Sequence, residues 1–530
     1  MAHNKDHVLQ KSIQNAWLTI LSSIAVRIFT FGINAYVLRH QRSEILGLGV
    51  RLLLLFDTLL FLSREAFRKA CLTRPKNGHW RGIINLTWLS VPLGCILSLV
   101  LGYTWIYVLE LPQWALVNSY VKCVYLTCAS VIITLCSEPF FIVGQAYMHI
   151  KFRSAVDLFW GCATPFVQGL VITFISKDED RLLWIGLASI LVSSVFLASH
   201  LVYFSYVIQQ DDGDEMPFRS MREFLPDVSR FNVDHSRLTL SSSFFKQGFF
   251  KQFLTEGEKY VFTWFSLMTL SEQGIYDVIA NLGSIPARLF FVKLEESAHL
   301  YFSQTVSRKL KAEMPQEEAP SRHLNLLLKG LILLGMVIVT FGMSYSHLLL
   351  HLYGGTLLSD GLGPILLRSH CFYIIFLALN GISECYAFNV MSAESVSTYN
   401  YWMAVMSVIF LSCAWGFANM FGPVGFILAN MCNLSMRIVH NFRVIHRRHV
   451  GTKVNPLKDL VPKGKVLLTL FASGAICQIS EHFIYKPTVK ESVIHLTVGI
   501  MLFFLTLFVI VMSDKDWRAL IQAKLIKKDQ

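Results

Sequence analysis

Long apolar stretches, separated by short polar ones, run along the whole chain. A membrane-spanning helix needs about 20 mostly apolar residues, and about fourteen stretches reach that length. They cover residues 13–38, 44–66, 83–108, 117–145, 153–175, 182–208, 241–270, 273–305, 324–351, 363–391, 396–418, 422–443, 466–485 and 490–512. Charged residues interrupt the segment 241–305 most often. The pattern predicts an all-α polytopic membrane protein with about 14 transmembrane helices.

Two longer polar segments, 209–240 and 444–465, divide these helices into groups. We expect an N-terminal six-helix lobe over 1–208, a C-terminal six-helix lobe over 241–443, and an extra helix pair over 466–512 before a tail at 513–530. Two six-helix repeats are a common transporter plan, with a hydrated cavity between them. Placing the N-terminus in the cytosol puts most loop Lys and Arg residues on the cytosolic side, so both termini are predicted to be cytosolic.

Composition narrows the function classes. The 530 residues are 54% hydrophobic and only 15% charged, with a mean hydropathy of +0.49. The net charge is +12, and the basic residues lie between the hydrophobic runs rather than on one folded face. This distribution favours an anionic membrane surface or an anionic substrate over nucleic acid as the partner. Most of the 11 cysteines lie inside apolar runs and are interpreted as small buried hydrophobes rather than metal ligands.

Polar residues recur at helical spacing inside the apolar stretches. A charged group in hydrocarbon costs roughly 2.5–3.5 kcal/mol on insertion scales, and residues seven apart share one helix face. The stripes are Arg27, Asn34 and Gln41; Arg51, Thr58 and Glu65; Asn281, Arg288 and Glu295; and Asn430 with Arg437, while Asn380 and Glu384 are one turn apart and Lys251 and Glu258 lie in a densely charged helix. A single stripe is equally consistent with a hydrogen-bonded helix contact. Stripes on six helices favour one cavity that accepts an anionic head group.

Two shorter features add to this interpretation. Gly283 and Pro286 lie in the middle of a predicted span, where they favour a helix kink that either lines a cavity or only serves packing. The C-terminal 527-KKDQ-530 matches a dilysine retrieval signal of the endoplasmic reticulum. The sequence contains no GxxxxGK[ST], HExxH or GxSxG motif, so we expect a transporter rather than an enzyme, without cofactor or metal.

Several stretches together carry a family resemblance: 61-FLSREAFRKAC-71, 251-KQFLTEGEKYV-261, 274-GIYDVIANLGSIPARLFF-291, 380-NGISECYAF-388 and 424-VGFILANMCNLSMRI-438. The chain resembles the oligosaccharide-diphosphodolichol translocation proteins of the endoplasmic reticulum. That family is similar to the flippases that include multidrug and toxin extruders and lipid II flippases. The resemblance implies two six-helix lobes plus two further helices. It also implies a role in N-linked glycosylation, in which a mannosylated chitobiosyl-diphosphodolichol reaches the lumenal leaflet.

This function suggests roles for the striped residues. The residues expected to face the diphosphate are Arg27, Arg51, Arg64, Arg68, Lys251, Arg288 and Arg437, because guanidinium forks bind phosphate oxygens. The acids expected to pair with them in the empty state are Glu65, Glu258, Glu295 and Glu384. The amides expected to bind sugar hydroxyls are Asn34, Asn281, Asn380 and Asn430. The stretch 63-SREAFRK-69 would form the cytosolic mouth of the cavity.

Two other function classes fit the same residues. One is a non-transporting accessory protein that presents the glycolipid to enzymes of the N-glycosylation pathway, which would then be partners. It predicts that cavity arginines can be replaced while loop residues cannot. The other is an ion-coupled exporter of small amphiphiles with Glu258 or Glu295 as the titrating acid, a reading that the basic bias of the predicted cavity opposes.

Overall fold

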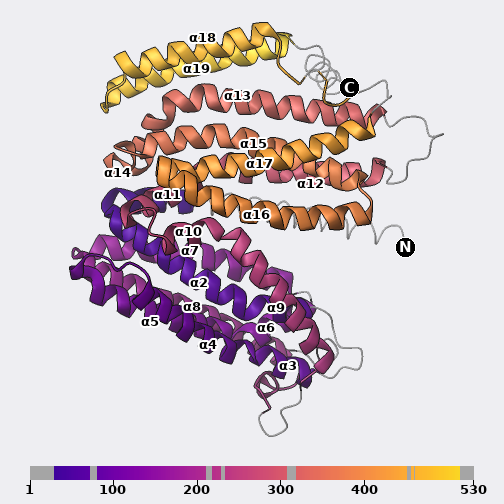
Figure 1. The fold of residues 1–530 in the computed structure, drawn as a ribbon. Coiled ribbons are helices and arrows are strands. Elements are labelled where there is room, and N and C mark those ends of the chain that lie inside the picture. The colour runs from indigo at the N-terminus through magenta and orange to yellow at the C-terminus, as the bar shows by residue number, and fades with distance from the viewer. Residues whose placement is uncertain are drawn as a thin grey trace, which may run out of the picture. The chain divides into compact units, whose positions relative to one another are not determined.

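The computed structural model describes residues 29–71, 80–147, 149–210, 216, 218–227, 233–306, 318–449, 455–458 and 460–513. Within these ranges every regular element is a helix (Figure 1). The chain forms two compact units, Met1–Gly274 and Ile275–Gln530. Each unit is described by itself below.

The first unit contains a helix over 29–40 and then α2 (Ser43–Ala70), α3 (Arg81–Trp88), α4 (Ser90–Tyr103), η1 (Thr104–Val108), α5 (Trp114–Leu135), α6 (Glu138–Ala146), α7 (Ile150–Phe174), α8 (Asp178–Gln210), η2 (Met221–Phe224), α9 (His235–Thr255) and α10 (Gly257–Trp264). Helix α11 (Leu270–Gly283) begins in the first unit and ends in the second. The second unit continues with η3 (Ala287–Phe291), α12 (Val292–Thr305), α13 (Glu318–Gly354), α14 (Thr356–Ser359), α15 (Gly363–Val390), α16 (Ala393–Phe421), α17 (Pro423–Arg448), α18 (Gly464–Phe483) and α19 (Val489–Ser513).

The predicted helices are present wherever the structure describes the chain. Eleven helical segments among the described residues are long and apolar enough to cross a membrane. They correspond to eleven of the predicted spans. The segments 241–270 and 422–443 are helical as α9–α10 and α17 but are not among the eleven, and 13–38 lies mostly outside the described residues. The fold class is therefore confirmed as an all-helical, multi-pass membrane protein, and the number fourteen stays a prediction.

Helix α2 lies at the centre of the first unit and packs against α4, α5 and α9. Its leucine-rich stretch supplies Leu55 and Leu59, both fully buried, to a core that also contains Trp105 and Val131. Helix α9 thus packs within the first compact unit. The six-helix lobe predicted over 241–443 stays a prediction.

Two of the long apolar stretches are interrupted by breaks. Helix α5 ends at Leu135 and α6 starts at Glu138, with Pro139 in its first turn. Helix α11 ends at Gly283, and the π-helix η3 begins directly after Pro286. Because proline lacks an N–H donor, it ends or kinks a helix at these points. The kink predicted at Gly283 and Pro286 corresponds to a turn at Ser284 and the π-helix η3 that follows.

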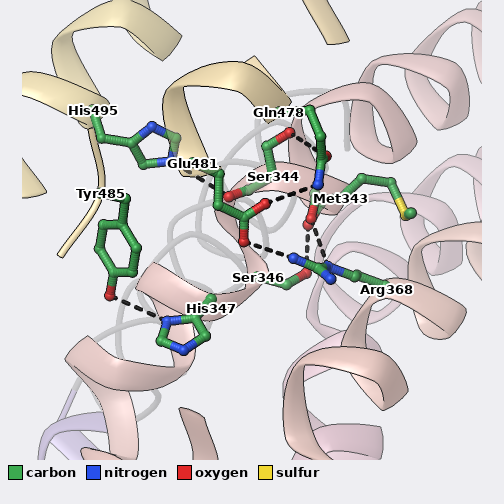
Figure 2. Close-up of polar contacts among 10 residues, drawn as sticks. Met343, Ser344, Ser346, His347, Arg368, Gln478, Glu481, Tyr485 and His495 are labelled. Atoms are coloured by element: carbon green, nitrogen blue, oxygen red, sulfur yellow. Dashed lines mark hydrogen bonds and ion pairs between the residues drawn. The ribbon is translucent and has the colours of Figure 1, made fainter. Parts of the chain in front are cut away.

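In the second unit α15 packs between α13 and α17, and the C-terminal pair α18–α19 packs on α13. Figure 2 shows the polar contacts that join this pair to the other helices. Arg368 of α15 donates to the carbonyl oxygen of Met343 at 2.7 Å and to Glu481 of α18 at 2.6 Å. Gln478 accepts from Ser344 at 3.0 Å. Polar side chains thus connect α13, α15 and α18 inside an otherwise apolar region. Apolar packing alone would do little there to fix the orientation of one helix against another.

Replacing Glu481 tests how much this attachment stabilises the protein. Glu481→Ala leaves Arg368 without its carboxylate, and breaking a largely buried ion pair costs about 3 kcal/mol. We expect a clearly lower midpoint of thermal unfolding for the purified full-length protein in detergent. The matched control is Glu296→Ala, because Glu296 pairs with Lys293 at 2.9 Å while both side chains are more than 60% exposed. The control should cost at most about 1 kcal/mol. Equal shifts in the two variants would contradict a stabilising role for the Arg368–Glu481 pair.

Candidate functional site: two arginine–glutamate clusters

The first cluster joins the end of α2 to the start of α6. Arg68 donates from Nε and Nη2 to the two oxygens of Glu138, each at 2.6 Å. Nη1 of Arg64 lies 3.6 Å from the same carboxylate. The Glu138 side chain is only 2% exposed, whereas Arg64 and Arg68 are 25% and 17% exposed. A buried acid therefore holds two guanidinium groups at the edge of the unit.

The local sequence places Glu138 where it can pair with Arg64 and Arg68. The break after Leu135 starts a new helix, so Glu138 lies in the first turn of α6, where the helix dipole favours a negative charge. The Arg68 guanidinium carbon also lies 3.5 Å from the ring centroid of Phe141, a cation–π contact. The sequence prediction missed Glu138. The visible signal was a single acid next to a proline within 131-VIITLCSEPFFIV-143.

Glu65, predicted to pair with the arginines, has a different partner. Its Oε1 lies 3.3 Å from Nζ of Lys69, one turn along the same helix, and both side chains are about one-third exposed. The predicted stretch 63-SREAFRK-69 thus does contain a cluster of charges. The acid that pairs with Arg64 and Arg68 comes from α6 instead.

Arg51 lies at the opposite end of α2 and is fully buried. Its Nε donates to Oε1 of Gln273 at 2.9 Å, and its Nη1 donates to the carbonyl oxygen of Glu110 at 2.7 Å. Thr58, from the same predicted stripe, is buried and bonded to the hydroxyl of Tyr260 at 2.6 Å. This face of α2 is therefore occupied by contacts within the first unit.

The second cluster joins α15 to α17. Nη2 of Arg437 lies 2.8 Å from each oxygen of Glu384. The amide nitrogen of Asn380 donates to Oε2 of the same carboxylate at 2.9 Å. Asn380 itself is buried, and its side-chain oxygen has no hydrogen-bond partner among the described residues. Three residues predicted from two helices thus meet at one point.

Glu295 of α12 lies beside this second cluster. Helix α12 packs on α15, and Oε1 of Glu295 occupies the space that a Cβ atom would take at Gly381. Gly381 follows Asn380 directly, so the absence of a side chain lets a carboxylate approach the α15 backbone. The Sγ of Cys385 also donates to the backbone carbonyl of Glu295 at 3.7 Å.

The remaining predicted residues differ in their contacts and burial. Arg288 is exposed and donates to the carbonyl oxygen of Asn281 at 2.5 Å, across the break before η3. Asn281 donates to Asp277 at 3.0 Å, and Asn430 donates along its own helix to Phe426 at 3.2 Å. Lys251 is exposed, whereas Glu258 and Asn34 are half-buried. Arg27 lies outside the described residues.

The two clusters resemble each other in plan but differ in net charge. In each, the acid follows a serine, as Ser137-Glu138 and as Ser383-Glu384, and accepts from an arginine of another helix. The first cluster has two arginines and one acid, whereas the second has one arginine together with Glu384 and Glu295. The first has one excess positive charge and two guanidinium groups, and it is therefore suited to an anion.

Among solved structures, the chain is similar to one described as "Lipid II flippase MurJ, inward closed conformation". The TM-score is 0.58 with 10% sequence identity, covering 93% of this chain and 99% of that chain. At this identity the likeness shows a shared fold.

Curated relatives are similar over nearly their whole length. The protein from Xenopus tropicalis called "Man(5)GlcNAc(2)-PP-dolichol translocation protein RFT1" is 37% identical, covering 99% of this chain and 98% of that protein. Proteins of the same name from Mus musculus and Drosophila melanogaster are 35% and 36% identical, covering 90% and 94% of this chain and 90% and 95% of theirs. The profile of the Rft-1 family, described as "Rft protein", matches residues 11–524. The chain therefore belongs to the Rft protein family.

Proposed function

We propose that this protein is a glycolipid translocator that helps move a mannosylated chitobiosyl-diphosphodolichol from the cytosolic to the lumenal leaflet of the endoplasmic reticulum membrane. Three observations support the proposal. The relatives carry the name of a Man(5)GlcNAc(2)-PP-dolichol translocation protein. The fold is that of a lipid flippase. The first cluster offers two guanidinium groups around one carboxylate.

The contact of Arg64 and Arg68 with Glu138 carries the proposal. A carboxylate and a phosphate group present similar pairs of oxygens to a guanidinium fork. Glu138 would therefore occupy the place of a phosphate until the substrate arrives. A diphosphate, with more oxygens and more charge, would then take over the exposed sides of both arginines. The dolichol chain would remain in the lipid throughout.

We propose that the other charged residues act in the same way, with acids pairing with basic side chains until the diphosphate replaces them. The other basic residues proposed to meet the diphosphate are Arg27, Arg51, Lys251, Arg288 and Arg437, with Glu65, Glu258, Glu295 and Glu384 as counter-charges and Asn34, Asn281, Asn380 and Asn430 as sugar-binding groups. Arg437 would have to exchange Glu384 for the substrate, because it is paired in this structure. Arg51 would have to leave its buried bonds to Gln273 and Glu110.

The membrane arrangement is part of the proposal. We propose two six-helix lobes over 1–208 and 241–443, an extra pair over 466–512, and both termini in the cytosol. The dilysine signal at 527–530, which lies outside the described residues, would return the protein to the endoplasmic reticulum. The excess of loop Lys and Arg on the proposed cytosolic side supports this orientation.

Substitution of Arg68 tests the proposed anion site. In liposomes containing purified protein, Arg68→Ala should slow the transfer of labelled glycolipid about 10- to 100-fold, because a hydrogen-bonded charge contact is worth about 1.5–3 kcal/mol. Arg68→Lys should give an intermediate rate, since it keeps the charge and loses the fork. The measurement is the fraction of label accessible on the far leaflet with time.

Two controls separate transport from folding. Arg42→Ala removes an arginine from the other end of α2, 79% exposed and paired with Asp178, and should leave the rate unchanged. The double variant Arg68→Ala with Glu138→Gln leaves no unpaired buried acid, so it should unfold like the parent and still transport slowly. Transport at the parent rate by a folded Arg68→Ala protein would rule out the proposed site. Failure of the parent protein to move glycolipid would favour the accessory role.

Glu138→Gln tests whether the acid competes with the substrate. Without the carboxylate, Arg64 and Arg68 are free to bind an added anion, so inorganic diphosphate should bind about tenfold more tightly, a change of about 1.4 kcal/mol. The measurement is the rise of the unfolding midpoint with diphosphate at constant ionic strength. Glu65→Gln is the matched control, because Glu65 pairs with Lys69 and not with the arginines. Equal diphosphate responses in both variants would contradict the competition.

A further inference from the structure

The carboxylate of Glu295 lacks a charged partner in the part of the chain that the structure describes. No ion pair or side-chain hydrogen bond is formed by Glu295 there, although the residue is half-buried and lies in a helical segment long and apolar enough to cross a membrane. Arg437, the nearest cation of the second cluster, is engaged by both oxygens of Glu384. An ionised carboxylate inside a membrane-spanning helix is costly unless something neutralises it.

Asn380 provides a second, independent sign of a missing ligand. The residue is 6% exposed, and its amide nitrogen is committed to Glu384. The opposite arm of the amide, Oδ1, is therefore directed away from Glu384 and accepts no hydrogen bond from the described residues. A buried acceptor without a donor is uncommon and marks a site for water or an ion.

The backbone brings these two groups together. Glu295 Oε1 lies directly over Gly381, the residue after Asn380, in space that any side chain would fill. Helix α12 is thus held against α15 at the level of the unpartnered amide oxygen. The Glu295 carboxylate of α12 therefore lies against α15 at the residue next to Asn380, and Glu384 follows Asn380 by one helical turn.

Charge balance indicates what this position binds. Glu295 and Glu384 carry two negative charges and Arg437 carries one positive charge, so one negative charge remains. A divalent ion would overcompensate it, and no group of three or more His, Cys, Asp or Glu side chains suited to a metal ion occurs among the described residues. We propose that Glu295, Asn380 and Glu384 form a binding site for one monovalent cation, either an alkali ion held by oxygen ligands or a proton held on Glu295.

The surroundings of Glu295 contain few competing charges. On its own helix, Lys293 pairs with the exposed Glu296, and His299 contacts Asn389. From η3, which packs on α12, Arg288 donates back to Asn281. From α15, Glu384 and the thiol of Cys385 face Glu295. The proposal concerns binding by the second unit and does not depend on glycolipid transport. Where a cation is bound, it replaces the sugar-binding role proposed above for Asn380, and the cation shares Glu295 and Glu384 with Arg437.

The test measures cation binding to the purified full-length protein in detergent. The unfolding midpoint is followed with Na⁺, K⁺ and choline chloride at one ionic strength, and separately from pH 5 to pH 8 in choline chloride. An alkali site predicts that Na⁺ or K⁺ stabilises the parent relative to choline, with saturation. A proton site predicts no difference among the salts and a stabilisation that grows as the pH falls. For an alkali site Glu295→Gln should weaken the apparent affinity at least about tenfold. For a proton site it should abolish the part of the pH response that comes from Glu295.

Gly381→Ala tests the geometry without changing any charge. The added Cβ overlaps Oε1 of Glu295, so the carboxylate must move and the cation response should weaken markedly. Gly416→Ala is the matched control, because a Cβ there meets no atom within 4 Å, and Glu296→Gln controls for loss of an exposed acid. Both controls should respond like the parent.

Two results would overturn the proposal. One is a parent protein that responds neither to alkali ions nor to pH beyond the response of Glu295→Gln. The other is a normal response in folded Gly381→Ala. If either variant fails to fold, equilibrium binding of radioactive Na⁺ and potentiometric proton uptake by the parent decide the question. Less than one Na⁺ or proton bound per protein, compared with Glu296→Gln, would exclude the site.

Discussion

The cost of placing charged side chains in hydrocarbon governs the arrangement of this protein. Each such charge is unfavourable by roughly 2.5–3.5 kcal/mol on insertion scales, so it must be paired, hydrated or used. Arg68 meets this requirement through Glu138, Arg437 through Glu384, and Arg368 through Glu481. Each pair joins two helices that are distant in sequence, so the same contacts that neutralise charge also determine which helices pack together.

A helix break positions the acid of one of these pairs, Glu138. A continuous helix through Leu135 and Glu138 would keep all its backbone groups bonded internally and would rotate the acid by its regular 100° per residue. The break before α6 instead places Glu138 in a new first turn, where backbone N–H groups and a carboxylate attract each other. The break before η3 similarly leaves the Asn281 carbonyl oxygen available to Arg288. Irregular backbone at membrane depth is tolerated where polar side chains satisfy it.

The two units each contain a cluster of arginine and glutamate, in opposite proportions. The first cluster has more positive charge than negative and suits an anionic head group. The second has more negative charge than positive and suits a cation. If both sites operate, the protein would bind an anion in one unit and a cation in the other, and their charges would offset each other. The C-terminal pair α18–α19 takes part in neither cluster and is attached through its own buried polar contacts (Figure 2).

The sequence alone determined the helices, because only a segment that bonds its own backbone internally can cross hydrocarbon, and that demand appears as long apolar runs. It also identified contacts made within one helix, such as Asn380 with Glu384, since spacing along a helix defines a shared face. It could not identify partners across helices. Glu138 rather than Glu65 holds Arg68, and Arg51 is bonded inside the first unit rather than open to a cavity. Periodicity gives the direction of a side chain around its own axis, whereas the partner depends on which helix packs there, at what depth and with what rotation, and only the tertiary structure decides these.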